Sequence, residues 1–230
     1  AELDGIGVVG YLNDGIPSSD NNVTNNTLFN CGSDYASVDL SYAQGTIVRD
    51  NNIYATGQYD SSGIMINAVS SNNIVENNLI NNGDYGIWIT TGSSNNLIRN
   101  NKVMNSLYNG LYLDSEVYNN IVTHNDFINN ASQAYQEADQ TNVWSQNGVG
   151  NYWSNHNCID ENEPIGICDN PFYLPGGQDN FPLASPVWDI RNITNINEYN
   201  RELSNLKTKK ENYDNKKQIK TKKDNRRSKI

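Results

Sequence analysis

Apolar and polar residues alternate along residues 63–130 in three copies of one short pattern. The copies read GIMINAVSSNNIVENNLINN, GIWITTGSSNNLIRNNKVMN and GLYLDSEVYNNIVTHNDFINN, and their first glycines are 23 and 24 residues apart. Within each copy, isoleucine or leucine recurs two positions apart, as in Ile64 and Ile66. A period of two predicts a short strand with one buried face, and a fixed period of this length is typical of repeat proteins.

Two further apolar columns recur at the same intervals. They are Val75, Ile98 and Val122, and then Ile80, Val103 and Phe127. Each copy therefore contains several strands that are too short to be stable alone, with no helical pattern between them. Stacking the copies buries all the columns, with about 4.8 Å between neighbouring strands. The sequence predicts an all-β solenoid, a parallel β-helix of about six coils over residues 1–150.

The outer coils are less regular than the central three. Residues 23–62 contain two drifted copies of the pattern. Residues 1–22 predict an irregular first coil in poor register. Residues 131–150 predict a weaker last coil, in which Ala134 lies near the expected position of the repeated glycine.

Asparagine accounts for 42 of the 230 residues. Its side chain tolerates the left-handed backbone of tight bends, and stacked asparagines can hydrogen-bond along the axis of a sheet stack. The residue three places after each core valine or isoleucine gives the column Asn26, Asn51, Asn78, Asn101 and Asn125. We expect this column to be a structural ladder and not a binding site. The same register places Glu76 between Arg49 and Arg99 on the outer surface.

Charge divides the chain into two parts. Residues 1–188 contain 3 basic and 20 acidic residues, a net charge of −17, whereas residues 189–230 contain 13 basic and 6 acidic residues, a net charge of +7. In the first part, the aromatic-rich residues 151–188 predict a cap over the open end of the last coil. Residues 189–230 predict a basic tail, partly helical or disordered. It is either a solvated linker or a segment that binds an acidic polymer, nucleic acid or anionic lipid.

Cysteine usage and hydropathy bear on the compartment. Cys158 and Cys168 lie in one loop-rich segment and are candidates for a disulfide, which would fit a location outside the cytoplasm, while Cys31 would remain unpaired. The chain contains no apolar run of about 18 residues, so the sequence predicts no transmembrane helix. The chain begins in repeat-like sequence, so we expect a mature form or a part of a larger protein.

The repeats and the segment after them resemble one family. Stacked GIxI…SSNNxIxNNxIxNN copies followed by GNYWSN and IGICDNPFYLPGGQDNFPL are similar, over residues 20–184, to the NosD-type, carbohydrate-binding and sugar-hydrolysis (CASH) class of β-helix. The resemblance implies a right-handed coil in the bacterial periplasm or on an archaeal cell surface. The family name also implies periplasmic copper handling. Copper prefers cysteine, methionine and histidine ligands, but the candidates are scattered along the chain: Met65, Met104, His124 and His156.

A calcium site is a further hypothesis from the resemblance. Family members tend to carry a DxDxDGIGD-like loop, and oxygen ligands at alternating positions suit Ca²⁺. The candidate ligands here are Asp160, Asn162 and Asp169. Asn162 and Pro164 replace two of the acidic positions, so a polar loop closed by a disulfide is the alternative interpretation.

Side chains between the buried residues of the first strand point outward. The candidate ligand-binding residues on this face are Met65, Tyr85, Trp88, Tyr108 and Tyr112. Exposed aromatic rows can stack on sugar rings and often mark binding sites, although packing between coils would also explain them. The sequence therefore favours a non-catalytic, extracytoplasmic module that acts as a surface scaffold or binds a polysaccharide or another cell-surface polymer.

A polysaccharide-processing hydrolase, lyase or epimerase is the alternative. Hydrolysis needs two carboxylates about 5–10 Å apart, and the candidates are Asp114 and Glu116. No acidic cluster recurs on adjacent coils, and the coils contain few of the basic residues that lyase chemistry needs. Both observations favour a module without catalytic activity.

Overall fold

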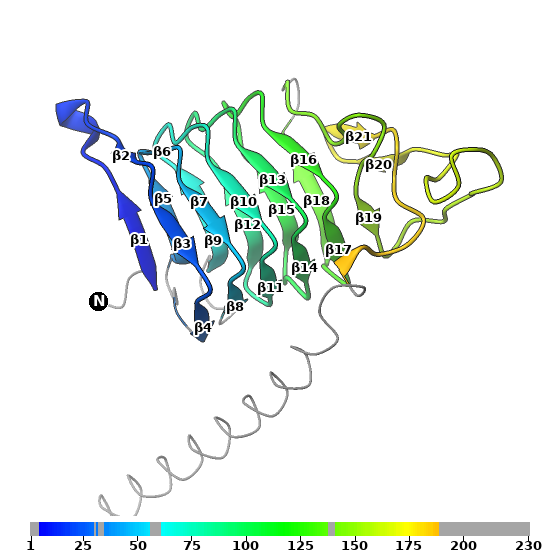
Figure 1. The fold of residues 1–230 in the computed structure, drawn as a ribbon, viewed down its shortest axis with the longest axis horizontal. Coiled ribbons are helices and arrows are strands. Elements are labelled where there is room, and N and C mark those ends of the chain that lie inside the picture. Colours follow the sequence, from blue (N-terminus) through cyan, green and yellow to red (C-terminus); the bar gives the residue numbers. More distant parts are fainter. Residues whose placement is uncertain (1–4, 30, 32–34, 56–60, 138–140, 189–230) are drawn as a thin grey trace, which may run out of the picture. The chain divides into compact units, whose positions relative to one another are not determined.

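The computed structural model describes residues 5–29, 31, 35–55, 61–137 and 141–188. In this part the chain forms short strands that stack as a parallel β-helix of about five turns (Figure 1). The predicted all-β solenoid is therefore confirmed. The basic tail, residues 189–230, and its expected helix lie outside the described residues.

The turns contribute their strands to three parallel sheets. Sheet 1 contains, in spatial order, β1 (Ile6–Val9), β5 (Ala36–Ser41), β9 (Ser62–Asn67), β12 (Tyr85–Ile89), β15 (Asn109–Leu113) and β18 (Ser132–Gln136). Sheet 2 contains β3 (Asn22–Thr24), β7 (Ile47–Arg49), β10 (Ile74–Glu76), β13 (Leu97–Arg99) and β16 (Ile121–Thr123). Sheet 3 contains β4 (Thr27–Phe29), β8 (Asn52–Tyr54), β11 (Leu79–Asn81), β14 (Lys102–Met104), β17 (Asp126–Ile128) and β19 (Tyr152–Trp153).

The predicted apolar columns form the core. Val75 pairs with Ile98 and Ile98 with Val122 in sheet 2. Ile80, Val103 and Phe127 align in sheet 3, and all six side chains are fully buried. The repeated glycines are explained by close approach between rungs, because a Cβ added to Gly86 would lie 2.6 Å from the carbonyl oxygen of Gly110.

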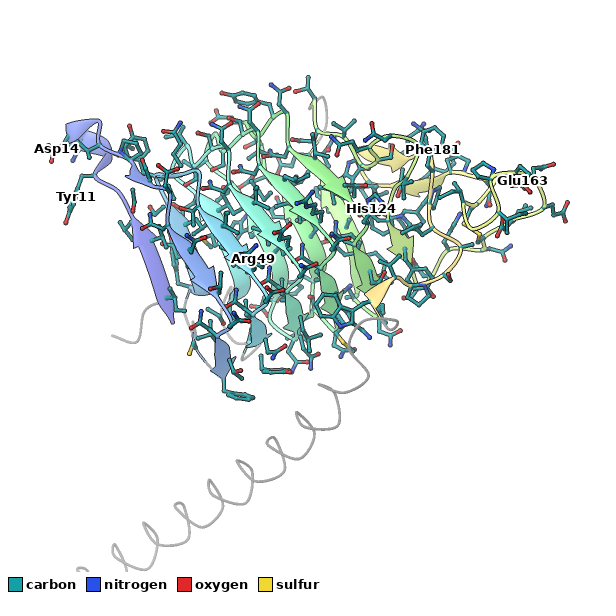
Figure 2. All side chains as sticks on the ribbon, in the orientation of Figure 1. Tyr11, Asp14, Arg49, His124, Glu163 and Phe181 are labelled. Carbon is teal, nitrogen blue, oxygen red and sulfur yellow. A yellow bond between two sulfur atoms is a disulfide. The ribbon has the colours of Figure 1, made fainter. Side chains whose placement is uncertain are left out.

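The first coil is more regular than the sequence suggests. β1 pairs with β5 in register, with Ile6 beside Val38 and Val8 beside Leu40. The expectation of poor register is therefore wrong for this strand. The extra residues instead project as a turn around the 3-10 helix η1 (Leu12–Asp14), which is followed by β2 (Ser18–Ser19) paired with β6 (Ala43–Gln44). Figure 2 shows Tyr11 and Asp14 at this projecting turn.

Asparagine closes the corners of the coil. Asn77, Asn100 and His124 have φ angles of 56°, 54° and 57°, in the left-handed region. His124 thus occupies a corner position that asparagine takes in the two preceding turns. Asparagine adopts this conformation more easily than most residues, which explains part of its abundance.

The predicted asparagine ladder is confirmed. The Oδ1 atom of Asn101 accepts hydrogen bonds from the backbone N–H and the side-chain amide of Asn78, at 3.0 and 2.9 Å. The amide of Asn101 donates in turn to Oδ1 of Asn125 and to the carbonyl of Val75. The ladder runs through Asn26, Asn51, Asn78, Asn101, Asn125 and Asn151. A second ladder runs through Asn73, Asn96, Asn120 and Asn142.

The first ladder ends on a carboxylate. Oδ2 of Asp179 accepts hydrogen bonds from the backbone N–H of Asn151 at 2.7 Å and from the indole N–H of Trp153 at 3.0 Å, and Oδ1 accepts from Phe181. Only donors point at this position, so a group that accepts without donating fits it. Burial raises the pKa of the Asp179 carboxyl, and these donors offset part of that effect.

Aromatic residues cap the end of the core beside Asp179. Trp153 stacks between Phe127 and Phe172, with ring centroids 4.7 and 4.4 Å away. Phe172 belongs to β20 (Phe172–Leu174), which forms an antiparallel hairpin with β21 (Gly177–Asp179). Both oxygens of the buried Asp126 accept backbone N–H bonds, from Val187 and Trp188. The segment thus covers the end of the coil, as the sequence predicts.

The outer charge pairing also follows the predicted register. Glu76 pairs in the sheet with both Arg49 and Arg99. Its carboxylate lies 2.7 Å from Nη2 of Arg99 and 3.8 Å from Nη1 of Arg49. Both arginines are partly exposed, so these pairs contribute little to stability.

Replacing Asn101 with alanine tests the contribution of the ladder. The change leaves the buried backbone N–H of Asn78 without its acceptor and removes the bonds that the Asn101 amide donates to Asn125 and Val75, so we expect the free energy of unfolding to fall by about 3 kcal/mol. Asn155→Ala, in an exposed turn of the cap, is the matched control and is expected to change it by less than about 0.5 kcal/mol. Chemical denaturation measures both values. Equal effects of the two substitutions would contradict a stabilising ladder.

Candidate functional site

The outer face of sheet 1 carries a column of large side chains. Asp39, Met65, Trp88, Tyr112 and Tyr135 are register partners on successive strands, from β5 to β18. They alternate with the buried core residues of the same strands and therefore point away from the core. Parallel stacking places like side chains above one another, so three consecutive aromatic residues form one continuous surface.

Two further tyrosines join this surface. The ring of Tyr85 lies 5.0 Å from Trp88, 5.4 Å from Tyr112 and 5.8 Å from Tyr108, between ring centroids. Trp88 and Tyr112 are 6.0 Å apart, and Tyr112 and Tyr135 are 5.5 Å apart. We call these five residues, Tyr85, Trp88, Tyr108, Tyr112 and Tyr135, the aromatic platform. The structure brings together all the aromatic residues that the sequence proposed for this face.

Exposure varies along the column. Tyr108 and Tyr135 are 54% and 38% exposed, whereas Tyr85, Trp88 and Tyr112 are half-buried. Met65 differs from the expectation, because only 3% of its surface is exposed and it cannot contact a ligand without a rearrangement. Asp39, its neighbour on β5, is also buried. The accessible part of the column therefore begins at Trp88.

Sequence reasoning did not identify Tyr135, because it aligned the last coil only approximately. It placed Ala134 near the position of the repeated glycine, and β18 pairs Ala134 with Leu111, the residue after Gly110. A shift of one residue exchanges the two faces of a strand. The usable signal is the pair Ala134 and Gln136, which alternates like Leu111 and Leu113.

Polar side chains flank the platform. The hydroxyl of Tyr112 donates a 2.9 Å hydrogen bond to Oε1 of Glu137, and the hydroxyl of Thr90 donates a 2.7 Å bond to Oδ2 of Asp114. Asp114 and Glu137 directly follow the register partners Leu113 and Gln136. The two carboxylates therefore lie on adjacent rungs of the same face.

These neighbours change the pKa of the Tyr112 hydroxyl. Burial raises the pKa of the Tyr112 hydroxyl, and the hydrogen bond to Glu137 and the negative charges of Asp114 and Glu137 raise it further. Tyr112 therefore stays protonated and remains a donor to Glu137 at physiological pH. The strands of sheet 1 contain no lysine or arginine in the part of the chain that the structure describes.

The pair Asp114 and Glu116 is not a matched pair of carboxylates on one face. Asp114 lies at the platform, whereas Glu116 is exposed in the following turn with a φ angle of 66°. The carboxylate beside Asp114 on the next rung is that of Glu137, which sequence reasoning did not identify. The repeat pattern is weak in residues 131–150, so the sequence alone did not align Glu137 with Asp114.

The cap loop contains the residues proposed for calcium. Cys158 and Cys168 form a disulfide with a Cα–Cα distance of 5.3 Å. Oδ2 of Asp169 accepts hydrogen bonds from the backbone N–H of Glu161 and from the side-chain amide of Asn162, both at 2.9 Å. These bonds lower the pKa of Asp169, the Glu161 bond most. Oδ2 of Asp160 accepts from Gly166. Calcium binding here stays a prediction.

A comparison with protein families gives one match. Residues 12–158 match the family described as "Periplasmic copper-binding protein (NosD)", which is more than half of the chain. The chain belongs to the NosD family. A comparison with curated proteins gave no match. No helix among the described residues of this NosD-family chain is long and apolar enough to cross a membrane.

The soft ligands of this NosD-family chain lie on separate elements. All of its cysteines, histidines and methionines are among the described residues. Met65 lies on β9 and Met104 on β14, in different sheets, and His124 occupies a corner. His156 lies in the cap beside the ring of Phe172, and two of the three cysteines are joined in the disulfide. The described residues contain no group of three His, Cys, Asp or Glu side chains placed to hold a metal ion.

The titration of Tyr112 tests the geometry of the platform. Replacing Glu137 with glutamine removes a negative charge and a charged acceptor, so the pKa of Tyr112 should fall toward its ordinary value of 10.0 without reaching it, because burial is its largest cause. Glu116→Gln is the matched control and should leave this pKa nearly unchanged. NMR titration of ring-labelled tyrosine, with Tyr112→Phe for assignment, measures the shift. An unchanged pKa in Glu137→Gln contradicts the contact.

Proposed function

We propose that this chain is an extracytoplasmic binding module whose aromatic platform binds carbohydrate. The observation that carries the proposal is the run of Trp88, Tyr112 and Tyr135 on successive rungs, joined laterally by Tyr85 and Tyr108. The family description, a periplasmic protein, supports a location outside the cytoplasm, and so does the disulfide of the cap loop.

The chemistry of the platform suits sugars. The faces of aromatic rings pack against the apolar C–H faces of sugar rings, and tyrosine hydroxyls and carboxylates hydrogen-bond to sugar hydroxyls. Here both kinds of group occur together, since Thr90, Asp114 and Glu137 flank the rings. The indole nitrogen of Trp88 is buried, and no residue in the described part of the chain accepts its proton. A small rearrangement on binding would give this donor an acceptor.

Copper handling, which the family description names, fits these residues less well. A copper centre needs several cysteine, methionine or histidine ligands that converge on one point. In this chain Met65, Met104 and His124 belong to three different parts of the coil. We therefore assign no copper-dependent step to the chain.

The proposal predicts that platform substitutions weaken binding to a neutral glycan. Trp88→Ala and Tyr108→Ala should each lower the affinity for a β-1,4-linked glucose hexamer about tenfold, because each removes a stacking ring. Tyr11→Ala, a 70% exposed tyrosine at the projecting turn of the first coil, is the matched control and should bind normally. Isothermal calorimetry measures the affinities, and circular dichroism confirms folding.

Tyr108 is the decisive variant, because its side chain is exposed and its loss should not disturb folding. If no neutral, acidic or basic glycan binds the wild-type chain, carbohydrate binding is wrong and a scaffold role remains. If a glycan binds Tyr108→Ala and Trp88→Ala with the affinity that it has for the wild-type chain, its site lies elsewhere.

One observation favours hydrolysis as a second candidate. Asp114 and Glu137 follow paired residues on β15 and β18, and neighbouring strands are about 4.8 Å apart. Retaining glycosidases hold their two carboxyl groups about 5–5.5 Å apart. Hydrolysis predicts that new reducing ends accumulate when the chain is incubated with a bound polysaccharide, and that Asp114→Asn abolishes them. Binding without new reducing ends excludes this candidate.

A further inference from the structure

The charges around the platform point to the class of glycan that it accepts, provided that the platform binds carbohydrate at all. We propose that the platform selects against polyanionic glycans and prefers glycans with free amino groups over neutral ones. The residues that determine this preference are Asp114 and Glu137.

Both carboxylates are held at the edge of the platform. Glu137 accepts the hydroxyl proton of Tyr112, a ring at the centre of the platform, at 2.9 Å. Asp114 accepts from Thr90 at 2.7 Å and from the backbone N–H of Ser115 at 2.7 Å. These hydrogen bonds fix the positions of both carboxylates relative to the rings. A glycan that lies along Trp88, Tyr112 and Tyr135 passes beside two fixed negative charges.

No positive charge among the described residues balances them on this face. The three basic residues of the described chain are Arg49, Arg99 and Lys102. Arg49 and Arg99 lie in sheet 2, where they pair with Glu76. Lys102 lies in sheet 3 and is buried. The strands that carry the platform, β12, β15 and β18, contain no charged residue, and the residues that directly follow β15 and β18 are the carboxylates Asp114 and Glu137.

This arrangement has opposite consequences for acidic and basic sugars. A glycan carboxylate would be brought close to Asp114 and Glu137, and like charges at short range repel. A protonated amino group at the same place would form an ion pair with one of them. Because the site is partly exposed, each effect should be modest, about 3- to 10-fold in affinity, and sensitive to salt.

Three hexamers with one backbone test the preference. They are β-1,4-linked glucose, glucosamine and glucuronic acid, compared by calorimetry at a slightly acidic pH, where the amines are protonated and the carboxyls ionised. The glucosamine hexamer should bind about 3- to 10-fold more tightly than the glucose hexamer, and the glucuronic acid hexamer about 3- to 10-fold more weakly. In 1 M salt, where the screening length is about 3 Å, the three affinities should converge.

Variants locate the cause of the preference. In Asp114→Asn/Glu137→Gln the ratio of glucosamine to glucose affinity should fall toward one. Glu161→Gln/Glu163→Gln, an equal change of charge at two exposed residues of the cap loop, should keep the wild-type ratio. Figure 2 shows Glu163 at the far end of the coil. The ratio is the readout, because it is insensitive to a general weakening of binding.

The outcomes separate this inference from the proposed function. If the glucose hexamer binds but the glucuronic acid hexamer binds equally or better, the selectivity is wrong while carbohydrate binding stands. A ratio that persists in the double variant also overturns the assignment to Asp114 and Glu137. If none of the three hexamers binds, both proposals are wrong.

Discussion

Hydrogen bonds that run along the coil axis hold one rung of this β-helix to the next. The backbone supplies them in each sheet, and asparagine ladders supply them at the corners, where Asn78, Asn101 and Asn125 each accept from one rung and donate to another. An amide can both accept and donate, which makes asparagine suitable for every internal position of such a ladder. The ladder ends at Asp179, which only accepts. The asparagine content of the chain is thus a consequence of how its rungs are joined.

Strict stacking also creates the surfaces. In a parallel coil, each position of the repeat becomes a column, so a residue type that recurs becomes a continuous strip. In sheet 2 this gives the alternating charges of Arg49, Glu76 and Arg99. In sheet 1 it gives the aromatic platform, with its negative edge at Asp114 and Glu137. The proposed glycan site depends on the same axial contacts as the core. A shift of one residue in the register between neighbouring strands would turn a ring of the platform to the other face of its sheet.

The central coils could be predicted from sequence because their glycine, core and asparagine positions recur at nearly constant intervals. The columns of Val75 and Ile80, the ladder and the partners of Glu76 were all predictable for this reason. The register of the last coil could not be predicted exactly, since Gln133 stands where earlier coils have glycine, and Tyr135 and Glu137 were therefore not identified. The burial of Met65 has no signal in its own sequence segment. The NosD family is described as copper-binding. The spacing of the methionines and histidines in this sequence already indicated that these copper-ligand candidates are scattered.

Hydrogen exchange of asparagine side-chain amides, followed by NMR, tests most directly whether the ladder holds the rungs together. The amide protons of Asn78 and Asn101 are buried and bonded to the next rung. They should therefore exchange only through global unfolding, at rates that follow the unfolding free energy as denaturant is added. Exchange as fast as that of the exposed Asn155, with no dependence on stability, would contradict the axial ladder and the stacked surfaces that rest on it.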